Sequence, residues 1–401
     1  MSMLPRSLAD RSEARRRADI ACAARARAKA FVVSVTAVSP DASLEVWREP
    51  PRGDYPDPRL LALTGRERLE SWGRGRAPAP PLSRLTGAVI AEVGGGTAAA
   101  AMPVTGWLLN SAGAIGGGTL AIVSDIAFGC SIQTQLPAAT PYTTAELSMS
   151  FLRPARLDTA LHAGGQAIHV GRSVALSEVF LTEAGTDRLI AHGTSRCAVL
   201  PAIDPVPERP DELPPIEPDA DSDSDPFRRP WPSDAILPQE VWDELSGREV
   251  IDRQLAGELP PPPIHYLTGI RPVEVDEGSA IVRMPCTVWL SSPARTVQGG
   301  VIATLADTAM ALAVQTTTPP ATAFAGLDLK VNYLRPVLPD GRELTAHASV
   351  IHAGRTLVIT RAEVLNEDGK PVALATGSSM YLPGRPATLG ELELGAEAED
   401  Q

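Results

Sequence analysis

The sequence predicts an α+β protein of two tandem domains, each an antiparallel sheet wrapped around one central helix. Shifting the 401-residue sequence by 182 positions aligns residues 61–154 with 243–336 without a gap, and more than a third of the aligned residues are identical, far above chance. Each repeat contains one strongly apolar segment followed by alternating apolar and polar residues. This pattern is typical of a buried helix followed by half-buried strands.

The elements of each repeat follow in the same order, with a short helical segment, two strands, the central helix and four further strands. The expected helices are 58–72 and 117–133 in the first repeat and 239–256 and 299–315 in the second. The expected strands are clearest at 88–93 and 97–103 in the first repeat and at 327–334, 344–352, 356–366 and 371–381 in the second.

The domain organisation follows from the repeat and from local composition. We expect an N-terminal extension at 1–56, a first domain at 57–202, a linker at 203–238, a second domain at 239–386 and an acidic tail at 387–401. The extension shows no counterpart in the second repeat. The linker is dense in Pro, Asp and Glu and should bury too little apolar surface to offset chain entropy. We therefore expect a disordered or loosely draped connection.

Composition excludes several classes of function. A net charge of -12 and a pI near 5.1 give no basic face for a nucleic acid. No apolar run approaches the ~20 residues of a membrane span, so we expect no membrane partner. The four cysteines stand far apart without a Cys-x-x-Cys pair, which favours neither a disulfide framework nor a zinc site. A reducing cytoplasm is the simplest compartment, and we expect no bound metal.

Each central helix carries one charged side chain, Asp125 in the first repeat and Asp307 in the second. An unpaired carboxylate among apolar residues is costly unless something makes use of it. A capped or paired structural aspartate is one explanation. Because both aspartates lie mid-helix, beyond any N-cap position, and recur in both repeats, we favour a functional role.

A glycine pair opens each of these helices seven residues before the aspartate, and a later strand ends in Leu-Arg-Pro in both repeats. This pattern resembles the hotdog fold, and specifically the PaaI-type acyl-CoA thioesterases. The resemblance covers both repeats and implies two tandem hotdog domains paired as a pseudo-dimer. It also implies a thioester hydrolase acting on a small or medium acyl-CoA, with coenzyme A as part of the substrate and no other cofactor. Two such chains could further pair as a homodimer.

The two repeats depart from the family in different ways. The family pattern before the helix resembles Asn-x-x-Gly-x-x-His-Gly-Gly. The first repeat keeps Asn110 but has Gly116 at the His position, whereas the second has Ser292 and Gln298 at the two positions. Relatives often carry a hydroxyl on the following strand, where the first repeat has Thr144 and the second has a glycine.

Helix geometry explains why both repeats are needed. Seven residues span ~10 Å along a helix, so one repeat cannot aim its glycine turn and its aspartate at one carbonyl group. If the domains pair with antiparallel helices, as in the family's dimers, two composite sites result. The first composite site combines Asn110, the Gly117 amide and Asp307, and the second combines Ser292, Gln298, the Gly299 amide, Asp125 and Thr144. We favour the first because it keeps the asparagine.

The roles of these residues follow from thioester chemistry. Amide N–H groups at a helix start would stabilise the oxyanion that develops on the carbonyl oxygen. Asp125 or Asp307 would activate water as a general base or attack as a nucleophile, and the sequence does not separate these routes. The glycines could instead serve a tight turn or close packing.

Four arginines are candidates for the phosphates of coenzyme A, although such residues are more often solvated turn residues. They are Arg153, Arg335, Arg172 and Arg355.

Two alternatives to the thioesterase stay open. One is a non-catalytic acyl-CoA-binding or scaffold protein that lost the usual His in both repeats. The other is a hotdog hydratase, which would need a His at the helix start, where neither repeat has one.

Overall fold

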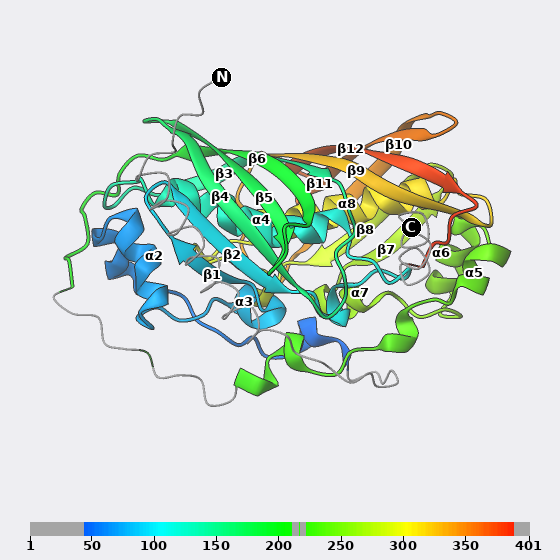
Figure 1. Cartoon of the computed structure of the whole chain (residues 1–401), viewed down its shortest axis with the longest axis horizontal. Coiled ribbons are helices and arrows are strands. Elements are labelled where there is room, and N and C mark those ends of the chain that lie inside the picture. Colours follow the sequence, from blue (N-terminus) through cyan, green and yellow to red (C-terminus); the bar gives the residue numbers. More distant parts are fainter. Residues whose placement is uncertain (1–43, 211–215, 217–221, 389–401) are drawn as a thin grey trace, which may run out of the picture.

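Twelve strands form one antiparallel sheet in the computed structural model, which describes residues 44–210, 216 and 222–388 (Figure 1). The strand order is β1-β2-β4-β5-β6-β3-β9-β12-β11-β10-β8-β7. The first half contributes β1 Val89–Val93, β2 Thr97–Pro103, β3 Tyr142–Phe151, β4 Ala160–Val170, β5 Val174–Glu183 and β6 Leu189–Val199. The second half contributes β7 Arg271–Asp276, β8 Ser279–Pro285, β9 Thr322–Tyr333, β10 Glu343–Ala353, β11 Leu357–Leu365 and β12 Pro371–Pro383.

The two halves join through one strand pair. Strand β3 runs antiparallel to β9, with Ser148 opposite Lys330, so the sheet continues from one half into the other. Each half therefore contributes six strands in equivalent order around the β3–β9 boundary.

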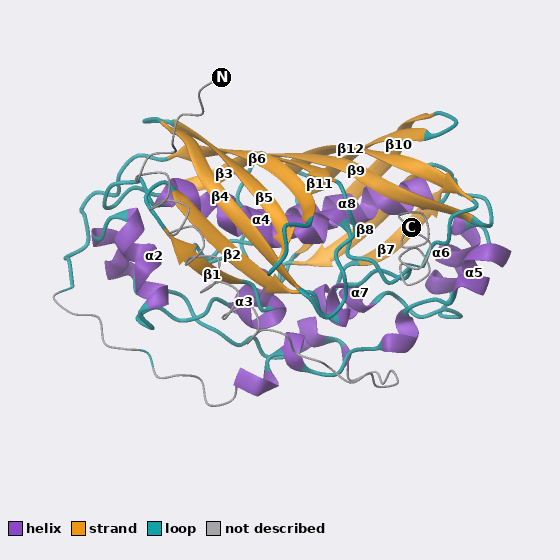
Figure 2. Ribbon diagram, in the orientation of Figure 1, coloured by secondary structure: helices purple, strands orange, loops and turns teal. Residues whose placement is uncertain are grey.

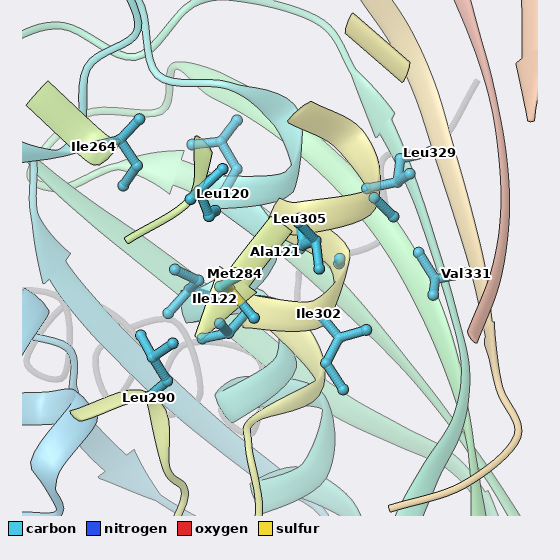
Figure 3. Close-up of a cluster of buried hydrophobic side chains, with 14 of the residues drawn as sticks. Leu120, Ala121, Ile122, Ile264, Met284, Leu290, Ile302, Leu305, Leu329 and Val331 are labelled. Carbon is cyan, nitrogen blue, oxygen red and sulfur yellow. The ribbon is translucent and has the colours of Figure 1, made fainter. Parts of the chain in front are cut away.

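The central helices α4 Gly117–Gln133 and α8 Gly299–Gln315 lie side by side beneath the arched sheet (Figure 2). Both are apolar on nearly all sides, because each faces the sheet on one side and its counterpart on the other. One hydrophobic core runs through both halves (Figure 3), with Leu120 of α4, Leu305 of α8 and Val331 of β9 among its members. The prediction of two hotdog domains paired as a pseudo-dimer is confirmed.

The outer helices repeat between the halves with the same local signals. The α-helices are α2 Gly65–Gly73, α3 Pro81–Thr86, α5 Gln239–Glu244, α6 Gly247–Leu255 and α7 Pro263–Thr268. The 3₁₀ helices are η2 Val46–Arg48, η3 Pro58–Ala62, η4 Gly106–Leu108, η5 Ser222–Ser224, η6 Pro226–Arg228, η7 Ser233–Ala235 and η8 Val288–Leu290. Capping boxes at Thr64 and Ser246 start α2 and α6, which explains why the two expected outer helices are each broken in two.

The expectation of a loosely draped linker is wrong for its last part. Asp225, Phe227 and Leu237 are buried, and Asp225 is ion-paired with Arg52 and Arg84. The composition of residues 203–238 is dominated by Pro and acids, but both of its aromatic residues, Phe227 and Trp231, come after residue 225, and Phe227 is buried.

Most of the predicted extension and of the acidic tail, residues 1–43 and 389–401, lies outside the described residues. In the part of the chain that is described, no helix is both long and apolar enough to cross a bilayer. Those same residues hold no group of three or more His, Cys, Asp or Glu side chains placed to bind a metal ion.

Candidate active site

The two central helices cross antiparallel, so that the aspartate of each lies at the start of the other. Asp307 Oδ2 accepts a hydrogen bond from the Gly118 N–H at 2.8 Å, and Asp125 Oδ2 accepts one from the Gly300 N–H at 3.2 Å. The first N–H groups of a helix have no partner within it, and no N-cap side chain fills that role in either helix. Each aspartate therefore caps the helix of the opposite domain.

Glycine at the second helical position makes this approach possible. A Cβ on Gly118 would lie 2.6 Å from Thr304 Cα, and a Cβ on Gly300 would lie 2.6 Å from Ile122 Cα. Both distances are too short for any side chain, so larger residues would force the helices apart. The close-packing explanation of the glycines is confirmed, and the same close crossing brings the helix N–H groups to the carboxylates. Their functional role stays a prediction.

Burial changes the acidity of both aspartates. Removal from water raises the pKa of Asp125 to about 6, against the opposing effect of hydrogen bonds from Thr144, Gly300 and Gly299. Burial also raises the pKa of Asp307 to about 6, opposed by the Gly118 N–H. A carboxyl group with such a pKa is ionised at neutral pH but is more basic than an exposed aspartate, as suits a general base.

In the first composite site, glycine stands at two positions beside Asp307. A Cβ on Gly116 would lie 3.6 Å from Asp307 Oδ2, an ordinary contact, so a side chain at this position would face the carboxylate. Gly326 stands where the other domain has a threonine, and a Cβ there would meet only the ring of Phe151, at 3.9 Å. The same ring lies against the backbone of Gly117.

Asn110 lies in the loop before this glycine turn and shapes it. Its Oδ1 accepts hydrogen bonds from the N–H groups of Ala112 and Ala114, both at 3.0 Å. Ser292 has the equivalent role in the second domain, where its Oγ accepts from the Ala294 N–H at 3.2 Å. The structure thus places both residues next to the glycine turns as loop-forming residues, and no hydrogen bond links either to an aspartate within the described residues.

The second composite site is filled at the two positions where the first has glycine. Thr144 Oγ1 donates to Asp125 Oδ1 at 3.0 Å, and Gln298 Nε2 donates to the Ile122 carbonyl oxygen at 3.0 Å. Tyr333, which corresponds to Phe151, donates its hydroxyl to the Gly299 carbonyl oxygen at 2.8 Å. Asp125 is only 7% exposed, whereas Asp307 is partly exposed. The second site is therefore the more enclosed.

The arginine candidates all lie on the surface. Arg153 donates to the Leu189 carbonyl oxygen at 3.0 Å, and Arg335 donates to the Pro371 carbonyl oxygen. Arg172 and Arg355 lie in the β4–β5 and β10–β11 turns. No contact in the described residues links any of the four to either aspartate, so their phosphate-binding role stays a prediction.

Sequence reasoning missed several residues that build the sites. The sequence places Gly118 and Gly300 in the glycine turns but does not indicate that they donate to the aspartates. No motif points to Phe151 and Tyr333, although they occupy matched positions at the ends of β3 and β9. Their pairing in the repeat alignment was the available signal.

The glycine at position 326 leads to a prediction about Asp307. Substituting Gly326→Thr should place a hydroxyl where Thr144 lies in the other site, and a hydrogen bond from it would favour the ionised carboxylate. We expect the pKa of Asp307 to fall. The acid limb of the pH profile of any activity that depends on Asp307 should then shift to lower pH. Gly326→Ala, which adds no hydroxyl, is the control and should leave the limb in place. Equal shifts for both variants would contradict the assignment.

Comparisons with known proteins agree on one family. The family model described as the thioesterase superfamily matches residues 112–190 and 295–373. The acyl-coenzyme A thioesterase PaaI of Escherichia coli K12 is 35% identical over 116 residues, which cover 29% of this chain and 80% of that protein.

Two solved structures are also similar. The E. coli PaaI protein from the phenylacetic acid degradation operon is 29% identical, with 35% of this chain and 98% of that chain covered and a TM-score of 0.31. The tesB protein of Mycobacterium avium subspecies paratuberculosis is 16% identical, with 76% and 98% covered and a TM-score of 0.48.

Proposed function

Because the chain belongs to the thioesterase superfamily, we propose that it hydrolyses the thioester of a small or medium acyl-CoA at the interface between its two hotdog domains. The observation that carries the proposal is the pairing of each buried aspartate with the glycine turn of the opposite domain. The acyl-CoA substrate of the PaaI relative supports the choice of thioester.

The first composite site is the one we propose for turnover. Asp307 is the more exposed of the two aspartates, and glycine stands at two positions where the second site carries Gln298 and Thr144. A thioester and a water molecule need room beside the carboxylate, and these two glycines leave it. The second site, with its hydrogen bonds made internally, would mainly hold the helix crossing together.

The proposed reaction uses the Gly117 N–H and Asp307. The Gly117 N–H, at the first position of α4, has no carbonyl group one turn back to bond to and would bind the oxyanion formed on the thioester carbonyl. Ionised Asp307 would take a proton from the attacking water. Alternatively, it would attack the carbonyl carbon itself, giving an anhydride that water then hydrolyses. In both routes the C–S bond breaks and coenzyme A leaves as the thiol.

Arg153 is the best placed of the four arginines to meet a coenzyme A phosphate near this site. It follows Phe151 by two residues, and the Phe151 ring packs against Gly117. Charge-assisted hydrogen bonds from a guanidinium group to a phosphate would lower KM more than they would raise kcat.

Thiol release from a panel of acyl-CoA substrates tests the proposal. We expect turnover by the wild type and none by the double variant Asp125→Asn/Asp307→Asn, which keeps the shape of both sites. Calorimetric binding of the same substrates should persist in the double variant. Wild-type binding without thiol release would refute the enzyme and support the non-catalytic acyl-CoA-binding alternative.

The acidity of Asp307 predicts the pH dependence of that turnover. Only the ionised carboxylate can act in either route, and burial raises its pKa to about 6. We therefore expect kcat to rise with pH along a limb centred near 6 and to level off above about pH 7. A limb centred near 4, where an exposed aspartate titrates, would show that a different group governs the reaction.

A further inference from the structure

Two segments outside the repeat alignment also correspond to each other. They are called here the first strap, residues 45–55, and the second strap, residues 225–237. Each begins with an acid, an aromatic residue, an arginine and a proline at matched spacing, namely Glu45, Trp47, Arg48 and Pro50 in the first and Asp225, Phe227, Arg228 and Pro230 in the second. Both form a 3₁₀ turn in which the arginine lies over the aromatic ring.

Each strap precedes one domain but packs on the other. Trp47 of the first strap lies against Gly269 of the second domain, and Phe227 of the second strap lies against Gly87 of the first. Both glycines have positive φ, and a Cβ on either would come within 2.9 Å of the aromatic ring. Figure 1 shows the blue first strap beneath α7, beside the green second strap.

Two buried tryptophans hold the straps by equivalent hydrogen bonds. Trp107 Nε1 donates to the Arg229 carbonyl oxygen of the second strap, and Trp289 Nε1 donates to the Glu49 carbonyl oxygen of the first, both at 3.0 Å. Both indole rings are 1% exposed. The straps also bind each other, because Arg229 Nη1 contacts both carboxylate oxygens of Glu49 at 2.7 and 2.8 Å.

The second strap continues along the loop that leads to the first composite site. The Trp231 ring fills the space beside Gly106, where a Cβ would lie 1.9 Å away. The Leu237 N–H then donates to the Ser111 carbonyl oxygen at 2.8 Å. Ser111 follows Asn110, whose side chain accepts hydrogen bonds from N–H groups of the same loop. The loop ends at Gly117. The strap therefore contacts the element that sets the position of the glycine turn.

From these contacts we infer that the second strap positions the glycine turn of the first composite site opposite Asp307. The strap and Asp307 both belong to the second half of the chain, while the glycine turn belongs to the first half. The linker thus contributes a third component of the site besides the two domains. This inference rests on the proposed function, and its residues act as positioning residues that touch no reacting atom.

The matched tryptophans provide the test. Trp107→Phe and Trp289→Phe each delete one indole N–H bond to a strap at a site of equal burial, so both should lower the Tm by a similar amount. In Trp107→Phe we expect kcat for acyl-CoA hydrolysis to fall roughly tenfold with KM little changed, and in Trp289→Phe we expect kcat to stay at the wild-type value. Trp231→Leu, which removes the ring that fills the space beside Gly106, should act in the same direction as Trp107→Phe.

Hydrogen–deuterium exchange gives a readout that does not depend on turnover. Trp107→Phe should speed amide exchange in residues 109–118 and leave 291–300 unchanged, and Trp289→Phe should do the reverse. Equal losses of kcat in the two variants, or unchanged exchange at 109–118 in both Trp107→Phe and Trp231→Leu, would overturn the inference. Absence of thiol release by the wild type would instead refute the proposed function, and the exchange rates would still decide whether the strap orders the turn.

Discussion

Replacing Asp307 by asparagine is expected to lower kcat for acyl-CoA hydrolysis by about two to four orders of magnitude, the usual contribution of a positioned acid–base group. The asparagine Oδ1 can still accept the Gly118 N–H, so the helix crossing should survive. It cannot accept a proton from water or attack as a carboxylate. Steady-state thiol release, with circular dichroism as the check on folding, measures the effect.

Asp125→Asn is the matched control for this substitution. It removes the corresponding carboxylate of the other central helix, in the site whose space is filled by Gln298 and Thr144. We expect kcat to change less than about threefold, well under the effect of a catalytic group. The reverse result, with Asp125→Asn inactive and Asp307→Asn active, would move the proposed site to the second interface.

Gly118→Ala is expected to cost about 3 kcal/mol of unfolding free energy, at the upper end of what overpacking a core usually costs. The new methyl group would lie 2.6 Å from Thr304 Cα and 2.7 Å from the Ala303 carbonyl oxygen. Neither backbone atom can move without moving α8 itself, so α4 and α8 must separate. The Gly118 N–H would then move away from Asp307, and activity should fall together with stability. Urea unfolding and thiol release measure the two effects.

Gly73→Ala is the control for the alanine substitution. Gly73 ends α2, and a Cβ there would meet nothing within 4 Å. Alanine should leave stability unchanged or raise it by up to about 1 kcal/mol. If Gly118→Ala proved as harmless as Gly73→Ala, the close crossing of the central helices would not be a constraint on the fold.

The sequence was sufficient to predict the main elements because the repeat supplied two independent copies of each pattern. The bounds expected for both central helices, 117–133 and 299–315, agree with α4 and α8. The strands expected at 97–103 and 344–352 agree with β2 and β10 to within a residue or two. Periodicity and glycine-rich turns are local signals, and local signals determine where such elements begin and end.

The candidate site was predictable in outline and not in detail. A single acid within an apolar helical segment is conspicuous in a sequence, so Asp125 and Asp307 could be identified from the local sequence alone. That Gly118 and Gly300 donate to these acids depends on how closely two helices cross, which is a property of tertiary packing. The position of Phe151 over Gly117 likewise depends on contacts between elements far apart along the chain.

The straps escaped prediction for a different reason. Their matched residues are separated by 180 positions, and the domains by 182, so an alignment at one fixed shift loses them. They are also short, and the acids and prolines around the second strap hide its few apolar residues. Burial of Phe227 and Leu237 becomes apparent only when the opposite domain provides the surface that covers them.

Joining both halves in one polypeptide has a consequence for how this protein can change over generations. In an assembly of two identical subunits, a mutation in the gene alters both interfaces at once, so neither can be relaxed without the other. Here Gly326 and Thr144 are encoded by separate codons, and selection can act on each independently. One interface can thus be shaped for chemistry while its counterpart is kept for rigidity.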